Sequence, residues 1–159
     1  MGHNHFVMSD QRIRRCLDNN VAILVGSVDV QGEPSCCRAL ALTSNDDLAT
    51  VTVFVPLATS RETIANVATT RRLAVVATHP IDHCSIQLKG IAGTARLARQ
   101  DEAPLVRKGF SGFTDILETL RFPPRVIRSV TAWPAFAIDM RVEEIFDQTP
   151  GPKAGARLR

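Results

Sequence analysis

The sequence predicts an α+β domain in which about six antiparallel strands form a small β-barrel flanked by two or three helices. Short runs rich in β-branched residues alternate with clusters of turn-forming residues, which is typical of strands joined by short loops. Other segments place apolar residues at helical spacing. The 159 residues suit one domain with one core.

The first half of the chain predicts a short helix over residues 10–19, followed by three strands. Residues 21–28 form an apolar run, and a turn rich in glycine and proline separates them from a second expected strand over residues 35–43. A third strand is expected over residues 49–55 and ends at Pro56. Three strands in series with short loops predict an antiparallel meander.

From Thr59 the apolar period becomes helical, so a helix is expected to cross the barrel. Strands are then expected over residues 72–78 and 85–97, and Gly90 and Gly93 inside the second one predict a bulge or a bend. A helix is expected over 101–120, either as one helix or as two separated at Gly109 and Gly112. A last strand is expected over 135–146.

Three regions are expected: an N-terminal arm and helix (1–20), a barrel domain (21–150) and a basic C-terminal tail (151–159), interpreted as a solvated end. The formal charge of +3 and the aromatic content of 5% do not favour nucleic-acid binding. No apolar run approaches the ~20 residues that cross a bilayer, so no membrane partner is expected and a cytoplasmic protein is predicted. Cys36 and Cys37 are adjacent, whereas Cys16 and Cys84 lie far apart, so reduced thiols are expected.

Candidate metal and nucleophile sites are weak. His79 and His83 are four residues apart and precede Cys84, but Pro80 opposes a helix between them, so surface histidines are favoured and no metal site is predicted. Cys36-Cys37 has no activating base nearby in sequence and is interpreted as strand packing, so no catalytic residue is identified.

A phosphate site would depend on side chains, because both common glycine-rich phosphate loops are absent. Guanidinium groups and hydroxyls then become the candidate ligands, which directs attention to Arg38, Ser60 and Arg61, with Thr59 beside them. The alternative for residues 59–61 is helix capping with a solvated arginine.

The chain resembles the FMN-binding split-barrel family related to pyridoxamine 5′-phosphate oxidase. The resemblance depends on the order of several motifs, which are Val51 to Pro56, Ser60-Arg61, Asn66, Arg72 to Val76, Ile86 to Gly90, and Asp147 to Pro152. It covers about Val21 to Pro152 and implies an obligate homodimer with the isoalloxazine ring across the subunit boundary.

The resemblance also implies the residues that bind the cofactor. Arg38, Ser60 and Arg61 match the phosphate ligands, Gln87 matches a glutamine near the ring, and the backbone around Val53, Phe54 and Val55 would line the ring edge. The full set of expected cofactor-binding residues is Arg38, Val53, Phe54, Val55, Thr59, Ser60, Arg61, Gln87 and Lys89.

Three departures from the oxidase pattern affect the expected function. Thr43 and Glu62 stand where the pattern has lysines, and Pro56 stands where it has a threonine. Because two cations are missing, oxidation of pyridoxamine phosphate is not expected. Arg71, Arg72 and Lys89 are the candidates to replace the missing cations. Trp133 is interpreted as a plug of the barrel, with stacking near the flavin as the alternative.

The leading hypothesis is an FMN-dependent oxidoreductase, a flavin reductase or flavin-dependent oxidase, acting on a small organic molecule. The alternatives are a non-catalytic module that binds haem or deazaflavin, and a dimeric scaffold that has lost its cofactor. Haem would need an axial ligand, for which His79 and His83 are the candidates.

Overall fold

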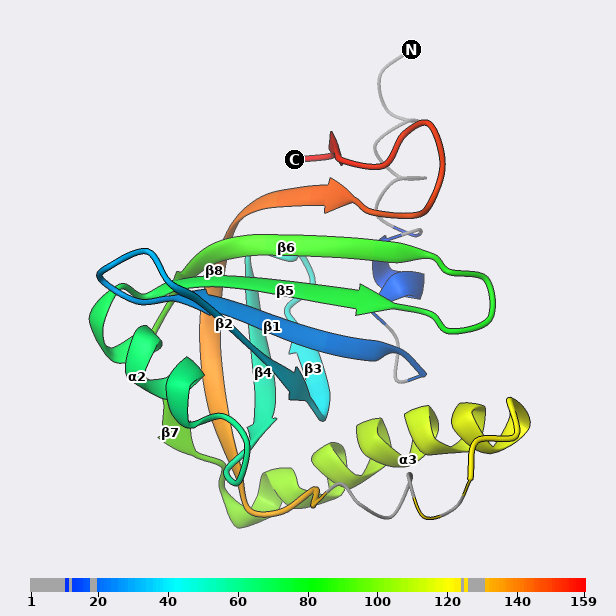
Figure 1. The fold of residues 1–159 in the computed structure, drawn as a ribbon, viewed down its shortest axis with the longest axis horizontal. Coiled ribbons are helices and arrows are strands. Elements are labelled where there is room, and N and C mark those ends of the chain that lie inside the picture. Colours follow the sequence, from blue (N-terminus) through cyan, green and yellow to red (C-terminus); the bar gives the residue numbers. More distant parts are fainter. Residues whose placement is uncertain (1–10, 12, 18–19, 124, 126–130) are drawn as a thin grey trace.

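A single curled antiparallel sheet forms the protein in the computed structural model, which describes residues 11, 13–17, 20–123, 125 and 131–159 (Figure 1). The strands follow the order β2-β1-β5-β6-β8-β4-β3, and two short strands, β7 and β9, pair with β8. The predicted α+β split barrel is confirmed. The strands are β1 (Ala22–Val28), β2 (Pro34–Ala39), β3 (Ala41–Ser44), β4 (Thr50–Pro56), β5 (Arg72–Thr78), β6 (Ser85–Ala92), β7 (Arg96–Leu97), β8 (Ala135–Asp147) and β9 (Ala156–Arg157).

Helices lie at the open parts of this sheet. Helix α2 (Arg61–Thr69) lies at one end of β1 and β2, and α3 (Ala103–Thr119) follows a 3-10 turn (Gln100–Glu102) and runs past β3 (Figure 1). Residues 13–16 are also helical, within the expected helix over 10–19, and the rest of that span lies partly outside the described residues. None of the helices in the described ranges is long and apolar enough to cross a bilayer.

The expected strand over residues 35–43 is broken at Leu40, so the predicted meander is wrong. β2 pairs with β1 and β3 pairs with β4, and these two segments occupy opposite edges of the sheet. The Leu40 N–H donates to the carbonyl oxygen of Phe54 at 2.8 Å, which joins the corner to β4. The chain therefore uses this segment to connect the two edges and close the barrel, a role that depends on distant partners rather than on local sequence.

The expected bulge in β6 is confirmed at Gly90, where the register with β8 shifts between Lys89 and Gly90. A Cβ atom at Gly90 would lie 2.0 Å from the carbonyl oxygen of Arg141, so the close approach of the two backbones requires glycine. The long strand expected over 85–97 divides after this bend into β6 and β7.

Helix α3 is continuous through Gly109 and Gly112. Gly109 is buried against the strand corner, and a Cβ there would lie 2.8 Å from the Leu40 carbonyl oxygen. A small cluster of buried residues, including Leu40, Phe54 and Val106, forms this second core. Trp133 is partly buried and packs against that cluster, not against the main core inside the barrel.

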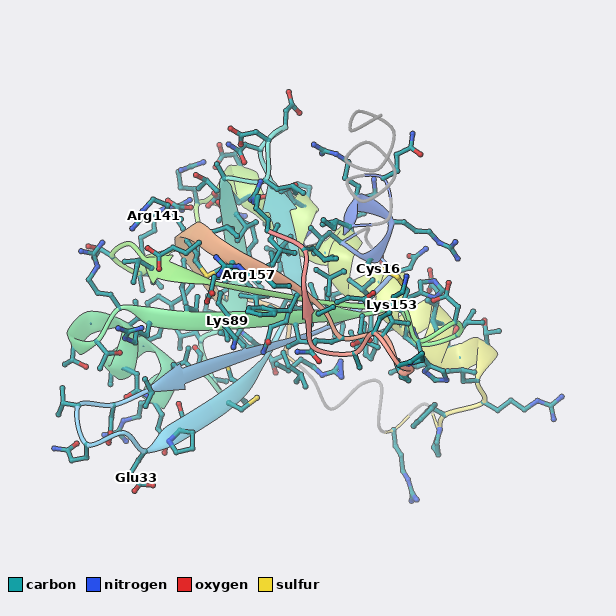
Figure 2. The ribbon with its side chains drawn as sticks, turned by 90° about the horizontal axis from the view of Figure 1, so that it is seen from above. Cys16, Glu33, Lys89, Arg141, Lys153 and Arg157 are labelled. Carbon is teal, nitrogen blue, oxygen red and sulfur yellow. A yellow bond between two sulfur atoms is a disulfide. The ribbon has the colours of Figure 1, made fainter. Side chains whose placement is uncertain are left out.

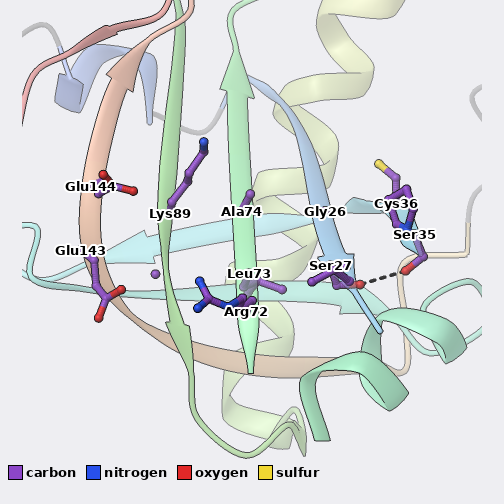
Figure 3. Close-up of a pocket in the computed structure, with 13 residues that line it drawn as sticks. Gly26, Ser27, Ser35, Cys36, Arg72, Leu73, Ala74, Lys89, Glu143 and Glu144 are labelled. Carbon is purple, nitrogen blue, oxygen red and sulfur yellow. Dashed lines mark hydrogen bonds between the residues drawn. The ribbon is translucent and has the colours of Figure 1, made fainter. Parts of the chain in front are cut away.

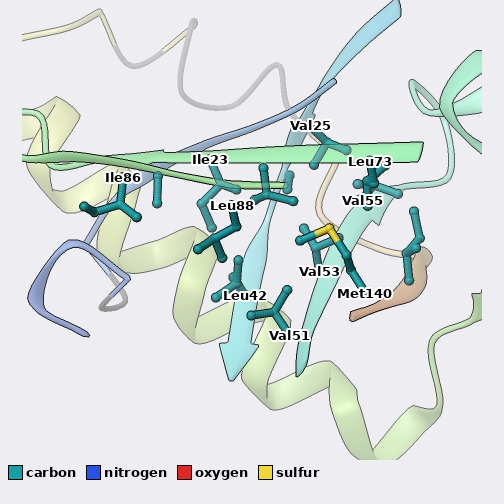
Figure 4. Packing of buried hydrophobic residues seen from close by; sticks show 14 of the residues in the cluster. Ile23, Val25, Leu42, Val51, Val53, Val55, Leu73, Ile86, Leu88 and Met140 are labelled. Atoms are coloured by element: carbon teal, nitrogen blue, oxygen red, sulfur yellow. The ribbon is translucent and has the colours of Figure 1, made fainter. Parts of the chain in front are cut away.

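The main core fills the concave side of the sheet. Alternate residues of the strands point into it, among them Val25, Val53 and Leu88 (Figure 4). These three side chains, and those of Val75 and Ile138, are fully buried. Complete burial of such a side chain contributes about 1.5–3 kcal/mol relative to exposure, so this cluster supplies most of the stability that holds the strands.

The C-terminal tail returns to the sheet, where a short stretch of its backbone pairs with β8 (Figure 2). β9 pairs with β8, and Arg157 lies 3.2 Å from a carboxylate oxygen of Glu144. The Arg159 guanidinium donates to the backbone carbonyls of Asp47 and Leu48. The tail residues remain exposed while their backbone extends the sheet.

A disulfide joins Cys16 to Cys84, so the prediction of reduced thiols is wrong for this pair. The cysteines are 68 residues apart in sequence, yet the helical turn at residues 13–16 lies against the β5–β6 loop, where Arg15 also pairs with Asp82. Cys36 and Cys37 are free thiols. Sequence distance was therefore a poor guide to which sulfur atoms meet.

Candidate functional site

An open hollow of about 270 Å³ lies where β4 leads into α2, and we call it the α2 hollow. It brings two of the expected ligands, Thr59 and Arg61, beside two residues of the edge strand β2. Arg61 forms no ion pair with any residue that the structure describes, so its five N–H donors face solvent. The lining residues are Ser35, Cys36, Ala58, Thr59, Arg61, Glu62 and Thr63.

Ser60 does not face this hollow. Its side chain is fully buried, and its hydroxyl donates to the carbonyl oxygen of Pro56 at 2.6 Å. It makes no side-chain cap to the helix N–H groups. Ser60 therefore fixes the start of α2 on the end of β4, and its hydroxyl proton is used in a hydrogen bond within the protein.

Arg38 lies on β2 with its guanidinium over the ring of Phe113 of α3, 4.3 Å from the ring centroid. Partial burial lowers the pKa of this guanidinium below its ordinary value, although it stays charged at neutral pH. Arg38 does not line the α2 hollow. The structure thus brings Thr59 and Arg61 together but leaves Arg38 in a separate stacked position.

A second, larger hollow of about 590 Å³ lies over β1, β2, β5, β6 and β8, and we call it the sheet groove (Figure 3). Lys89 of β6 and Arg72 of β5 line it together with Glu143 and Glu144 of β8, so the groove holds two cations beside two carboxylates of the neighbouring strand. Lys89 also lies 4.7 Å from the centroid of the Phe146 ring. Ser35 and Cys36 line both hollows, which makes the start of β2 their common wall.

Gln87 lies on the same outward side of β6 as Lys89, because the core residues Ile86 and Leu88 alternate with them. Its side-chain oxygen Oε1 accepts a hydrogen bond from the side-chain Nε2 of Gln148 at 3.1 Å. Gln87 lines neither hollow.

The segment expected to line a flavin ring is enclosed by protein. Val53 and Val55 point into the main core, while Phe54 points into the cluster under α3. The carbonyl oxygens of Phe54 and Pro56 accept hydrogen bonds from Leu40 and Ser60. The side chains of this strand therefore support the site from below and do not form its surface.

The two candidate haem ligands lie elsewhere. His79 and His83 occupy the β5–β6 loop, where the His79 Nδ1 atom lies 3.1 Å from a carboxylate oxygen of Asp82. This loop follows Thr78, five residues from Leu73 in the sheet groove, or roughly 17 Å along an extended strand. Within the described ranges, no group of three or more metal-ligating side chains converges.

The structure contains a buried polar cluster that the sequence did not predict. The Asn66 side-chain nitrogen of α2 lies 3.1 Å from the Ser27 hydroxyl and 3.0 Å from the Ser35 hydroxyl. The two hydroxyls are 2.8 Å apart, and Figure 3 shows the bond between them. Strand alternation points Ser27 and Ser35 inward, at positions where apolar residues are typical. Polar residues at core-facing positions were the available signal.

Comparisons with known proteins support the fold. No family model and no curated protein matches the chain, but solved structures do. HupZ of Group A Streptococcus matches with a TM-score of 0.56 and 17% identity, over 91% of this chain and 98% of its own. A putative pyridoxamine 5′-phosphate oxidase from Lactobacillus delbrueckii matches with a TM-score of 0.50 and 16% identity, over 87% and 90%.

An FMN-binding protein from Syntrophomonas wolfei matches with a TM-score of 0.51 and 12% identity, over 88% of each chain. An F420 reductase and a heme storage protein are also among the similar structures. At these identities the likeness establishes a fold shared by flavin-binding and heme-binding proteins. The choice of cofactor has to be argued from this chain's own residues.

Proposed function

Because the chain has the split-barrel fold of pyridoxamine 5′-phosphate oxidase-related proteins, we propose that it binds FMN at a homodimer interface and acts as an oxidoreductase on a small organic molecule. A phosphate dianion needs a cation and hydrogen-bond donors when no glycine-rich loop is present. The α2 hollow supplies both, through Arg61 and Thr59. The observation that carries the proposal is the position of the Arg61 guanidinium in this hollow without a carboxylate partner among the described residues.

The outer face of the sheet supports the proposed dimer. β1 and β5 are almost continuously apolar, which is typical of strands covered on both faces. Leu24 points away from the core and is 46% exposed. Arg72 and Lys89 line the sheet groove beside Glu143 and Glu144, so a second copy related by a two-fold axis could place cations against carboxylates. We place the partner subunit on this face.

The roles of the expected ligands follow from these positions. Arg61 and Thr59 would bind the phosphate, and Lys89 and Gln87 would face the partner subunit on the sheet side. Arg38 is proposed as a second cation on β2, outside the α2 hollow and held by Phe113. The chain lacks lysines at Thr43 and Glu62, so oxidation of pyridoxamine phosphate, which brings a phosphate of its own, is not proposed.

The bound flavin would supply hydride transfer, while the protein would supply orientation and a polar environment. The fixed donors of the chain would hold the phosphate, and the partner subunit would exclude water from the ring. No side chain is assigned as a proton donor. The proposed location remains the cytoplasm, but the Cys16–Cys84 disulfide weighs against it because such bonds are rare in reducing compartments.

The proposal is tested by titrating the purified protein with FMN and with riboflavin, which lacks the phosphate, in a calorimeter. The Arg61→Ala variant should weaken FMN binding by about 1.5–3 kcal/mol, or roughly tenfold to a hundredfold, and leave riboflavin binding unchanged. Arg107→Ala is the matched control, because Arg107 is an exposed arginine on α3 that lines neither hollow. A colourless protein that binds no FMN would refute the function.

Titrations with haem and with deazaflavin in the same series distinguish the alternatives. Binding of haem with a Soret band that is lost in the His83→Ala variant would identify a haem module, in which the β5–β6 loop supplies the axial ligand. Preferential binding of deazaflavin would keep the fold argument and replace the cofactor.

A further inference from the structure

Sequence reasoning assigned the hydroxyl of the phosphate site to Ser60, but the structure makes that hydroxyl unavailable, since it is buried and donates to Pro56. A different serine occupies the wall of the α2 hollow. Ser35 is partly exposed at the start of the edge strand β2, and it lines the hollow together with Thr59 and Arg61. The question is whether Ser35 has a proton to donate there.

The hydrogen bonds of the cluster limit the protons that Ser35 has available. The Asn66 amide has two N–H donors and places its nitrogen 3.1 Å from the Ser27 oxygen and 3.0 Å from the Ser35 oxygen. The bond between the two hydroxyls, at 2.8 Å, uses one hydroxyl proton. One hydroxyl proton of the pair therefore remains, and it belongs either to Ser27 or to Ser35.

Exposure favours one of these two arrangements. Ser27 is 7% exposed and, of the two hollows, lines only the sheet groove, whereas Ser35 is partly exposed and lines both. The favoured arrangement uses the proton of the more buried hydroxyl inside the protein, because a donor without an acceptor costs more where burial is greater. In that arrangement Ser27 donates to Ser35, and the Ser35 proton remains for a ligand in the α2 hollow.

This arrangement makes Ser35 a group that only donates. Its oxygen accepts from both Asn66 and Ser27, which fills its two acceptor positions. Such a hydroxyl suits a ligand atom that accepts hydrogen bonds, as a phosphoryl oxygen does, and disfavours a ligand N–H or O–H. Glu62 also lines the hollow and offsets the charge of Arg61, so a neutral donor with a fixed direction contributes selectivity that charge alone does not give.

We infer that Ser35, oriented by Asn66 and Ser27, is a binding residue for a phosphoryl group in the α2 hollow and donates to it beside Arg61. This inference rests on the proposed function for the identity of the ligand as FMN. The same chemistry would bind free inorganic phosphate, so the test includes both sources.

The test measures FMN, riboflavin and inorganic phosphate binding to the full chain and to three variants. Ser35→Ala should weaken FMN binding about tenfold or more and leave riboflavin binding unchanged, since one hydrogen bond to a charged oxygen is lost. Ser35→Thr retains the hydroxyl and should restore FMN affinity to within about threefold. Ser27→Ala is the matched control: it removes the neighbouring hydroxyl but leaves Ser35 a donor, so its effect should be smaller than that of Ser35→Ala.

The outcomes separate this inference from the proposed function. If the wild-type protein binds FMN and Ser35→Ala binds it within twofold of wild type, the inference is overturned while the function stands. If the wild-type protein binds no FMN, the function fails, and phosphorus NMR with inorganic phosphate then decides: line broadening that is equal in wild type and Ser35→Ala, or absent from both, overturns the inference. Should Ser35→Ala fail to fold, Ser35→Cys, which keeps the size but is a weak donor, takes its place with the same expectation.

Discussion

The Cys16–Cys84 disulfide should account for a large share of the stability of the protein. It closes a loop between residues 68 positions apart. On the chain-entropy model, a cross-link of this length stabilises the folded state by about 4 kcal/mol, because it restricts the unfolded chain. Net stabilities of domains are about 5–15 kcal/mol, so reduction should bring this protein close to its unfolding threshold.

Urea unfolding with and without a phosphine reductant measures this effect. With a slope of about 2 kcal/mol per molar urea, a loss of about 4 kcal/mol lowers the unfolding midpoint by about 2 M. Cys84→Ser should have the lowered midpoint at the outset and should not respond to the reductant. Cys36→Ser is the matched control, because Cys36 is an exposed free thiol and this variant keeps the disulfide and its sensitivity to reduction.

Thiol counting tests the pairing itself. Protein unfolded without reductant should expose two reactive thiols, from Cys36 and Cys37, and four after reduction. Four reactive thiols before reduction would refute the disulfide. An unfolding midpoint that does not change on reduction would instead refute the entropic estimate, and would mean that core packing of Cys16, which is fully buried, already holds the helical turn in place.

Two further predictions concern the sheet. Leu24→Glu places a carboxylate on the proposed dimer face and should weaken the dimer at least a hundredfold, as measured by light scattering. Val30→Glu, at the exposed β1–β2 turn, is the control and should leave the dimer unchanged. A wild-type protein that is monomeric would refute this prediction. Gly90→Ala should destabilise the protein by about 3 kcal/mol or more in urea unfolding, because its Cβ would meet Arg141 backbone, and Gly26→Ala, whose Cβ has 4.0 Å of clearance, should stay within about 1 kcal/mol of wild type.

The elements that the sequence predicted well are those whose pattern is local. β5 was expected over the residues that it occupies, and β8 differs from its prediction by one residue at its end. In β5 the residues that alternate inward, Leu73, Val75 and Ala77, are all apolar, so the pattern indicates both the strand and its buried face. The Gly90 bulge was also predictable, because a glycine inside a strand often marks a close backbone approach.

The features that sequence reasoning missed depend on partners far along the chain. The break at Leu40 follows from its bond to Phe54 in a different strand pair. The disulfide forms because the fold brings together segments 68 residues apart. In the candidate site the identity of the motif residues was informative, but their direction was not: Ser60 and Arg61 are adjacent, yet the serine points inward and the arginine outward.

That difference in direction explains how a site can be rigid and open at once. The Ser60 hydroxyl fixes the first residue of α2 to Pro56, and Asn66 fixes the next turn of the helix to the strands through Ser27 and Ser35. The contacts of Ser60 and of Asn66 with Ser27 are buried and that of Asn66 with Ser35 is partly buried, so water competes little with them. Arg61 lies between them with a free side chain, and Ser35 presents the remaining proton. The Ser35 hydroxyl, held in this way, loses little conformational entropy on binding an anion, whereas Arg61 loses rotamer freedom and contributes its charge; the fixed donor is the physical reason to seek the phosphate at this end of the barrel.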